Sequence, residues 1–328
     1  MFQVLDKIEE KLDSNKFLDQ VHVFAPATVA NMICGYDILG FAVDYPGDEV
    51  IMKRTESLGI EILKITGDEG KLPLDVQKNT VSHSVWQLLC DLGLDKSFGL
   101  SIELHKKMPI GSGLGSSAAS TVAGIFALNE LLGNPLTKHE LLPYCMEGER
   151  LACGSAHADN VGPSLFGGIT LIPSSEPLII RSLPVPEDLY ATLIYPKVEV
   201  PTKDARKLIK DKVSLDKAVK QWGNIASLIA AIYEKDYKEI GRSMQDHIIE
   251  PSRSLLIPFF DQMKEISLDK GALTFGISGS GPTVMALSYE QNIAKDIASS
   301  IEDFLKDKQI EHLSFVSKIN KQGPYVKK

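Results

Sequence analysis

The sequence contains few cysteines and no spacing of cysteine or histidine that suits a metal site or a disulfide framework. Only four cysteines occur among the 328 residues, and no two of them form a C-x-x-C pair. Disulfide-rich secreted domains and thiolate zinc sites are therefore excluded. The seven histidines include no H-E-x-x-H motif. We expect a cytoplasmic protein, in which any metal is held by oxygen ligands.

Long apolar runs and an excess of positive charge are also missing. No stretch approaches the roughly 18 apolar residues that a membrane-spanning helix needs, and residues 1–20 lack the apolar core of a signal peptide. The 35 basic and 43 acidic side chains give a formal net charge of −8. Nucleic acids and anionic membranes attract proteins with a basic surface, so we expect neither as a partner. Any phosphate site must be local.

The composition is that of a globular protein with a substantial core. Hydrophobic residues make up 44% of the chain and charged residues 24%. At about 150 residues per domain, the length suggests two domains. Two prolines, Pro184 and Pro186, mark a linker at 182–188. We therefore expect an N-terminal extension (1–20) that forms an amphipathic helix for packing or oligomer contact, a first domain (21–188) and a second domain (189–328), with a homodimer as one possible assembly.

Strand and helix patterns are mixed without regular alternation, so the sequence favours the α+β class. Strands are expected at residues 21–26, 59–65, 100–105, 166–172, 189–195, 272–277 and 283–287. Helices are expected at residues 81–92, 117–132, 136–151, 215–233, 236–248 and 292–305. Thr137 and Glu140 form a capping-box pattern. In the helix at 215–233, apolar residues such as Val219, Trp222 and Ile229 recur at helical spacing and are expected to pack into the core.

The most informative segment is a glycine-rich loop, PIGSGLGSSAAS, at residues 109–120. It follows an expected strand and precedes an expected helix. Its glycines let the backbone approach a ligand closely, and the helix N-terminus offers unpaired N–H groups to a phosphate. Ser116 and Ser117 add hydroxyl donors, or a ligand for Mg²⁺. A tight packing turn explains the glycines but not the paired serines and alanines.

Two well-known phosphate loops do not fit this segment. The Walker pattern is absent because no lysine follows the last glycine. Gly113, Gly115 and Ala118 match the dinucleotide pattern G-x-G-x-x-A, but they lie more than 100 residues into the chain. The acidic residue of that pattern, expected about 20 positions later at the end of a strand, is missing. Dinucleotide binding is therefore disfavoured.

Two other segments accompany the glycine loop, at residues 26–40 and 276–283. The latter, with Gly279, Ser280 and Gly281, reads as a hairpin loop by itself. In this order and at these distances, the three segments resemble the three signature motifs of the GHMP kinase superfamily. The resemblance covers most of the chain beyond residue 20. It implies a two-domain α+β fold, with a first domain like domain 2 of ribosomal protein S5 and a ferredoxin-like α/β sandwich as the second.

Within that superfamily the sequence resembles the homoserine kinase family most. The resemblance extends to residues 156–161, 166–168, 195–206 and 246–258. It implies ATP-dependent phosphorylation of the side-chain hydroxyl of L-homoserine to O-phospho-L-homoserine, a step of threonine biosynthesis, with ATP and Mg²⁺ as cofactors. Binding an amino acid requires a guanidinium for its carboxylate and a carboxylate for its ammonium, because either charge is costly to bury unpaired.

The resemblance assigns roles to individual residues. Arg206 and Arg253 match the carboxylate-binding arginines of the family. Asn31, Asp37 and Asp159 match the polar groups that hold the amino group and the reacting hydroxyl, with His157 beside them. Taken singly, such residues are more often turn residues or exposed charges.

The nucleotide side is assigned in the same way. The residues that match the ATP-binding segment are Pro109, Gly111, Ser112, Gly113, Leu114, Gly115, Ser116, Ser117 and Ala118. The resemblance implies Mg²⁺ between Ser117 and Glu149, and adenine near Asn79. A helix N-cap explains Asn79 almost as well.

The first motif departs from the family pattern. Ile33 stands where the family usually has glycine, so we expect a stiffer and bulkier loop. Cys34 beside it is expected to be a small buried hydrophobe. The positions near the catalytic lysine of mevalonate kinase hold the neutral residues Pro26, Ala27 and Thr28. The resemblance therefore implies direct attack by the hydroxyl without a strong base, with Thr202 or the arginines assisting.

Three alternatives stay open at this point. Another GHMP kinase, of the mevalonate type, would not need two arginines together with an ammonium-binding carboxylate. A non-catalytic sensor would bind nucleotide and substrate without turnover, which the presence of Glu149, Ser117 and both glycine loops disfavours. An RNA-binding scaffold is disfavoured by the net charge of −8.

Overall fold

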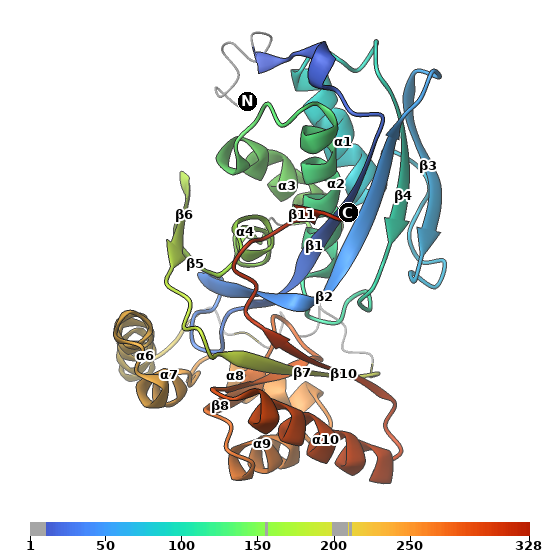
Figure 1. The fold of residues 1–328 in the computed structure, drawn as a ribbon. Coiled ribbons are helices and arrows are strands. Elements are labelled where there is room, and N and C mark those ends of the chain that lie inside the picture. Colours follow the sequence, from blue (N-terminus) through green and yellow to red (C-terminus); the bar gives the residue numbers. More distant parts are fainter. Residues whose placement is uncertain (1–10, 155–156, 199–208, 210–211) are drawn as a thin grey trace.

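The computed structural model describes residues 11–154, 157–198, 209 and 212–328. Two β-sheets lie one beneath the other (Figure 1), and each sheet carries its own helices. The helices α1, α2 and α4 pack against one face of the first sheet, α3 packs on these three helices, and α9 and α10 cover the far side of the second sheet. Within the described part of the chain, no helix is long and apolar enough to cross a membrane.

The first sheet has seven strands. They are β1 (Gln20–Ala30), β2 (Leu39–Arg54), β3 (Gly59–Thr66), β4 (Gly99–His105), β5 (Ile169–Ser175), β6 (Leu178–Leu183) and β11 (Tyr325–Val326). The main order is β11-β1-β2-β4-β3, and β2 also pairs with β5, which pairs with β6. Among the described strands of this sheet, β3 and β4 form the only parallel pair. Because β2 pairs with three other strands, its residues lie at the centre of the sheet.

Four helices lie on one side of this sheet and position the site, and α3 packs on the other three. They are α1 (Thr80–Asp91), α2 (Ser116–Leu131), α3 (Lys138–Cys153) and α4 (Ala158–Phe166). Nearly all of α2 is buried, and its small residues permit close packing. A Cβ at Gly124 would lie 2.4 Å from Val81 Cγ1 of α1, and one at Gly148 of α3 would lie 2.4 Å from Thr121 Cγ2 of α2. This close packing fixes the N-terminus of α2 relative to α3.

The second sheet has the βαββαβ connectivity of a ferredoxin-like sandwich. Its strands are β7 (Tyr190–Pro196), β8 (Thr274–Ile277), β9 (Val284–Ser288) and β10 (His312–Lys318), all antiparallel in the order β10-β7-β9-β8. The helices α9 (Phe260–Asp269) and α10 (Gln291–Asp307) pack on one face of this sheet. Ile297 of α10 and Phe275 of β8 belong to the apolar cluster between them. The expected α+β fold with two such parts is confirmed.

A separate apolar cluster lies between the two sheets. It joins residues such as Phe41 of β2 to Leu193 of β7 and Leu287 of β9. The chain leaves the first sheet at Leu183 and enters the second at Tyr190. The boundary at 182–188 stays a prediction, and β11 near the C-terminus returns to pair with β1 of the first sheet.

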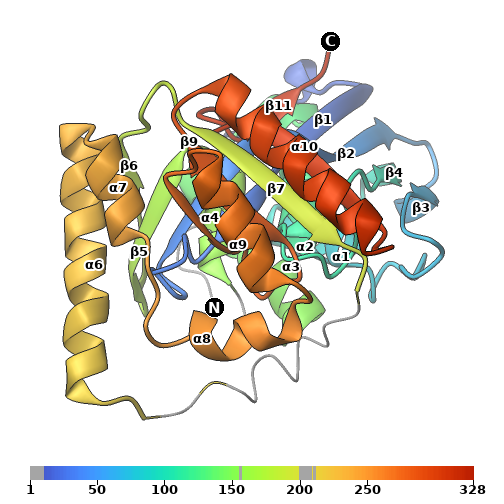
Figure 2. The ribbon, with the colours of Figure 1, turned by 90° about the horizontal axis from the view of Figure 1, so that it is seen from below.

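The remaining elements lie around the second sheet. They are α6 (Leu215–Glu234), α7 (Tyr237–Ser243), α8 (Glu250–Arg253) and the 3₁₀ helix η3 (Ser254–Leu256), while the 3₁₀ helix η2 (Ser14–Lys16) lies near the start of the described chain. Figure 2 shows α6 and α7 at the edge of the molecule, with α8 beneath. The helix expected in residues 1–20 falls largely on residues outside the described ranges.

Every other expected strand and helix is present, and the capping box of Thr137 and Glu140 is confirmed. Two boundaries were wrong. β5 begins at Ile169 rather than 166, because α4 extends to Phe166 and the next two residues are glycines with positive φ. The helix expected at 236–248 ends at Ser243, because Asp246 accepts backbone hydrogen bonds from the turn that follows.

The expectation for α6 was wrong in part. Its buried residues are Gln221, Leu228, Ala231 and Ile232. Trp222 is 54% exposed and Tyr233 is 61% exposed, so the periodic apolar residues form two faces and only one of them packs against the protein. Apolar periodicity by itself does not say which of two adjacent faces is covered.

Candidate active site

A cavity lies where the three expected motifs meet. Its volume is about 520 Å³, and its wall combines residues from the first motif (residues 26–40), the first glycine loop and the third motif (residues 276–283). Of the residues singled out in the sequence, those that line it are Asn31, Asp37, Gly111, Ser112, Gly113, Gly115, Ser116, Ser117, Glu149, His157, Asp159, Arg253, Gly279 and Ser280. Pro109, Leu114, Ala118 and Gly281 stand beside lining residues, and Arg206 and Thr202 lie outside the described residues.

The first glycine loop (residues 109–117) connects β4 to α2. Gly111, Gly113 and Gly115 all have positive φ, from 65° to 84°. A Cβ at Gly113 would lie 2.5 Å from the Ser278 carbonyl oxygen, and one at Gly115 would lie 2.0 Å from Thr28 Oγ1. Glycine is therefore required here by both conformation and contact. Gly115 is the N-cap of α2 and has no side chain to accept a hydrogen bond from the helix. The first N–H groups of this buried helix therefore lie at the cavity wall, where they suit an anion.

The third motif supports this loop from the second domain. Ser278 Oγ donates a hydrogen bond of 2.7 Å to the Gly113 carbonyl oxygen, and Thr283 N donates one of 3.1 Å to the Ser112 carbonyl oxygen. Gly279 N donates to the Ala30 carbonyl oxygen of β1. The third motif thus fixes the conformation of the first glycine loop and joins it to the end of β1.

Ser117 and Glu149 form the oxygen pair of the site. Ser117 Oγ donates a hydrogen bond of 2.6 Å to Glu149 Oε2, and Glu149 is only 3% exposed. A hydroxyl and a carboxylate on a cavity wall are the hard oxygen ligands that Mg²⁺ prefers. This pair could therefore hold a divalent cation beside the helix N-terminus.

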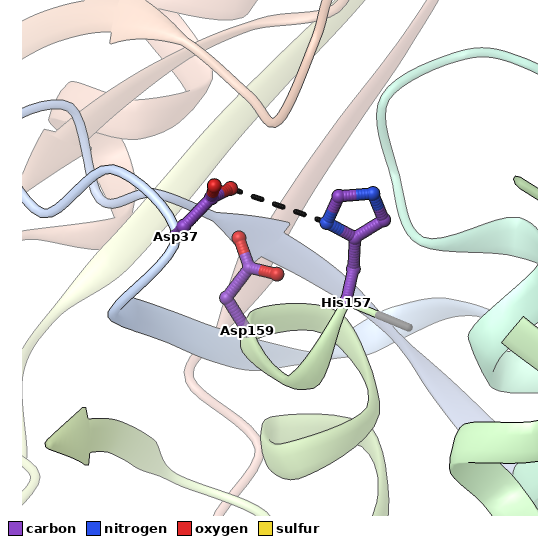
Figure 3. A group of neighbouring side chains, drawn as sticks. All are labelled: Asp37, His157 and Asp159. Atoms are coloured by element: carbon purple, nitrogen blue, oxygen red, sulfur yellow. Dashed lines mark ion pairs between the residues drawn. The ribbon is translucent and has the colours of Figure 1, made fainter. Parts of the chain in front are cut away.

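An acidic group with one histidine lies on the same wall. Figure 3 shows Asp37, His157 and Asp159 converging on one space, with His157 Nδ1 4.0 Å from Asp37 Oδ1. One ligand atom from each of the three lies within 4.8 Å of the others. Asp159 is 3% exposed, and its Oδ1 has no hydrogen-bond partner in the part of the chain that the structure describes. Burial, followed by the nearby charges of Asp37 and Glu149, raises the pKa of Asp159 to about 7. This arrangement attracts a cation.

Asn31 holds the loop of the first motif (residues 26–40) in an unusual conformation. Its Oδ1 accepts a hydrogen bond of 3.0 Å from Asp37 N, and its Nδ2 donates one of 2.9 Å to the Gly279 carbonyl oxygen. Asn31, Met32 and Ile33 have φ of 72°, 42° and 63°. Such values are strained for a β-branched residue, and Ile33 stands where a glycine was expected. Ile33 is nevertheless 4% exposed and packed in the apolar cluster between the sheets.

Cys34, the next residue, is the buried hydrophobe that we expected. It is fully buried, and burial raises the pKa of its thiol to about 12. The thiolate is the reactive form, so this cysteine is inert at neutral pH.

Arg253 adds a positive charge to the same cavity wall. It is 6% exposed, its Nη1 donates a hydrogen bond of 3.3 Å to the Gly279 carbonyl oxygen, and its guanidinium lies 5.3 Å from the centroid of the Tyr36 ring. Its Nε has no hydrogen-bond partner among the described residues. A buried guanidinium with an unused donor is suited to a carboxylate ligand.

Asn79 acts as the N-cap of α1. Its Oδ1 accepts a hydrogen bond of 3.0 Å from Val81 N, and its Nδ2 donates one of 3.0 Å to the Pro73 carbonyl oxygen. The residues on either side, Lys78 and Thr80, line the cavity. The cap explains why asparagine stands here, and the segment that it orders borders the cavity.

Three further residues of this wall were not assigned to the site from the sequence. Asn160 lines the cavity, and its Oδ1 accepts a hydrogen bond of 2.8 Å from Thr28 Oγ1. Tyr36 lies under Arg253, and Lys106 reaches the cavity from the end of β4. Asn160 and Tyr36 lie in segments that the sequence had already marked (156–161 and 26–40). Nothing in the sequence indicates that Lys106 pairs with Asp48.

Two family models match the chain. The model described as "GHMP kinases N terminal domain" matches residues 79–168, and that described as "GHMP kinases C terminal" matches residues 228–307. These segments contain both glycine motifs, Glu149 and Arg253.

Among curated proteins, the chain is 44% identical over 315 residues to the homoserine kinase of Chloroherpeton thalassium, which covers 93% of this chain and 99% of that one. It is likewise 44% identical over 316 residues to the homoserine kinase of Chlorobium phaeovibrioides, with the same coverage. The crystal structure of homoserine kinase from Cytophaga hutchinsonii superposes with a TM-score of 0.92 at 55% identity, covering 94% of this chain and 98% of that one. The L. major mevalonate kinase structure, with a TM-score of 0.70 at 14% identity over 90% of this chain and 95% of that one, shares the fold.

Proposed function

The chain belongs to the homoserine kinases of the GHMP kinase family, and we propose that its cavity aligns ATP with the L-homoserine zwitterion through the residues described above. The observation that carries this assignment is the set of groups on one cavity wall. The same wall contains the N-terminus of α2 with Ser117 and Glu149, and also Arg253 with Asp37 and Asp159.

The first glycine loop and the α2 N-terminus bind the phosphates of ATP. The glycines with positive φ leave the loop backbone accessible, and the helix N–H groups carry the positive end of the helix dipole. The segment around Lys78 and Thr80 borders the adenine side of the cavity.

Ser117 and Glu149 hold Mg²⁺ in this proposal. Their oxygens are 2.6 Å apart and face the cavity, so the donor set fits the ion. When bound, Mg²⁺ neutralises charge on the phosphates.

Arg253 binds the substrate carboxylate, and Asp37 and Asp159 bind its ammonium. The unused Nε of Arg253 and the unpartnered Oδ1 of Asp159 are the two buried polar atoms that this substrate would satisfy. Arg206 keeps its assignment as a second carboxylate ligand from the resemblance to the family. Asn31 acts by holding Asp37 and Gly279 in place.

The reaction is phosphoryl transfer between two aligned substrates. The homoserine hydroxyl oxygen forms a bond to the γ-phosphorus, the bond from that phosphorus to the bridging oxygen of ADP breaks, and the hydroxyl proton leaves. Such transfer depends mainly on positioning and on charge stabilisation. The product, O-phospho-L-homoserine, belongs to threonine biosynthesis.

A substrate panel tests this proposal. ADP release is measured with ATP and Mg²⁺ in the presence of L-homoserine, of 4-hydroxybutyrate, which lacks the ammonium, of 3-amino-1-propanol, which lacks the carboxylate, and of mevalonate. We expect turnover with L-homoserine and losses of about 10-fold or more with either truncated analogue. Equal turnover with a truncated analogue would contradict the two-charge site, and turnover with mevalonate alone would favour a mevalonate-type kinase.

A further inference from the structure

A buried ion pair lies behind the first glycine loop and has no part in the chemistry described so far. Asp48, in the middle of β2, is fully buried, and Lys106, at the end of β4, is 6% exposed. Lys106 Nζ donates a hydrogen bond to Asp48 Oδ2. It also donates to the Ser116 carbonyl oxygen at 2.8 Å and to Ser120 Oγ at 2.6 Å. Both partners of the pair therefore contact the residues that connect to this loop.

The Asp48 carboxylate reaches both ends of the loop. Its Oδ1 accepts a hydrogen bond of 2.9 Å from Lys107 N, just before the loop begins. Its Oδ2 accepts one of 2.6 Å from Ser120 Oγ, in the first turns of α2 just after the loop ends. One side chain from the central strand thus sets the separation between the end of β4 and the start of α2.

Stability alone does not account for such a pair. A buried ion pair is expensive to desolvate, and well-packed apolar residues in its place are often as stable or more so. What an apolar pair cannot supply is a fixed hydrogen-bond geometry at three backbone and hydroxyl groups. Because Asp48 neutralises Lys106, the lysine is also poorly suited to act as a free countercharge for phosphate.

We propose that Asp48 and Lys106 are positioning residues that hold the first glycine loop and the N-terminus of α2 in the geometry that aligns the ATP phosphates. They act through Lys107 N, the Ser116 carbonyl and Ser120 Oγ. The inference rests on the proposed assignment of this loop to the phosphates of ATP.

The test compares three variants by steady-state kinetics, nucleotide binding and thermal unfolding. Asp48→Asn keeps an acceptor for Lys107 N but removes the charge. Ser120→Ala removes one contact to each member of the pair and leaves the ion pair intact, so it remains informative if Asp48→Asn does not fold. Asn129→Ala is the matched control, because Asn129 is 1% exposed at the far end of α2 and hydrogen-bonded to Leu136.

The expected result is a selective effect on ATP. Asp48→Asn lowers kcat by about 100-fold, since small misplacements of aligned groups have effects of that order, and it raises the KM of ATP while the KM of homoserine stays near wild type. Ser120→Ala lowers kcat by about 10-fold, and Ser120→Thr, which keeps the hydroxyl, restores it. Asn129→Ala lowers the unfolding temperature but leaves kcat and both KM values near wild type.

Two results would overturn the inference. If Asp48→Asn and Ser120→Ala lose stability as Asn129→Ala does and keep their ATP kinetics, the pair is only structural. If the KM values of ATP and homoserine rise together, the pair supports the whole site rather than the loop. Binding of Mg²⁺-ATP by calorimetry separates this question from the proposed function. Weaker nucleotide binding in the variants supports positioning even if homoserine is not phosphorylated.

Discussion

The Ser117 hydroxyl donates a hydrogen bond of 2.6 Å to Glu149 Oε2 and so joins the first turn of α2 to α3. Two residues more than 30 positions apart in the sequence thus present two oxygens at the positive end of one helix. The close packing of α3 on α2 at Gly148, the residue before Glu149, makes this meeting possible.

Glu149→Gln should therefore weaken the use of Mg²⁺. The substitution keeps the size of the side chain but removes the charge that a divalent cation needs, and we expect kcat to fall by about 100-fold or more and the Mg²⁺ concentration for half-maximal rate to rise. The measurement is a Mg²⁺ titration of ADP release at saturating ATP and homoserine. Ser117→Thr keeps a hydroxyl and serves as the control, and an unchanged Mg²⁺ titration in Glu149→Gln would refute this metal assignment.

The buried carboxyl of Asp159 should make homoserine recognition depend on pH. Burial, Asp37 and Glu149 raise its pKa to about 7, so in the free enzyme it is neutral below that pH and charged above it. An ammonium binds the charged form. We expect kcat/KM for homoserine to rise with pH up to about 7 and then to level off, because kcat/KM reports ionisations of the free enzyme. The measurement is a pH profile for both substrates, with kcat/KM for ATP lacking this step.

Asp159→Asn is the control for that profile and should abolish the inflection while lowering kcat/KM. The same pKa also predicts the sign of a stability effect. An unfolded aspartate titrates near pH 4, so the folded protein without substrate loses stability as the pH rises from about 4 through 7. Homoserine should consequently raise the unfolding temperature more at pH 8 than at pH 6. A profile that falls as pH rises through 7 would rule out the ammonium role of Asp159.

Gly113→Ala tests the contact between the two domains at the first glycine loop. Its φ of +84° is strained for alanine, and the new Cβ would lie 2.5 Å from the Ser278 carbonyl oxygen. The conformation alone costs about 1–2 kcal/mol, and the contact adds to it. We expect lower stability and a raised KM for ATP, measured by urea unfolding and by kinetics.

Gly93→Ala is the matched control for Gly113→Ala. Gly93 has a φ of +69°, but a Cβ there would meet nothing within 4 Å. It should show the conformational cost alone, with unchanged ATP kinetics. Equal losses of stability and equal kinetics in the two variants would mean that the approach of Ser278 does not constrain the loop.

The motifs in the sequence predicted most of the cavity wall, because each motif lies at an end of a regular element and those ends converge. The glycines at 111, 113 and 115, the pair Ser117 and Glu149, and Arg253 all line or border it as expected. The role of Asn31 could not be predicted from the sequence. Its amide group hydrogen-bonds to Asp37, 6 positions away, and to Gly279, 248 positions away.

Other features could not be predicted for a physical reason. β2 contains Pro46 and Gly47, which usually end strands, yet it continues through them because β1 pairs with it both before and after Pro46, at residues 40–42 and 47–53. β5 pairs with it at 39–41 and β4 at 49–54. Lys106 and Asp48 meet only once β2 and β4 are paired, so neither residue had a signal in the sequence. Both the length of β2 and the contact between Asp48 and Lys106 depend on strand pairing between distant parts of the chain.

The most direct test of the two-charge site is the pair of Michaelis constants of Arg253→Leu, measured side by side with wild type. Arg253 is buried beside Tyr36 and Gly279 with an unused donor, and losing one charge-assisted contact costs about 1.5–3 kcal/mol. The account predicts that the KM of homoserine rises by roughly 10- to 150-fold while the KM of ATP stays near wild type. If both constants rise equally, or neither changes, Arg253 does not bind the substrate carboxylate, and the proposed two-charge site is wrong.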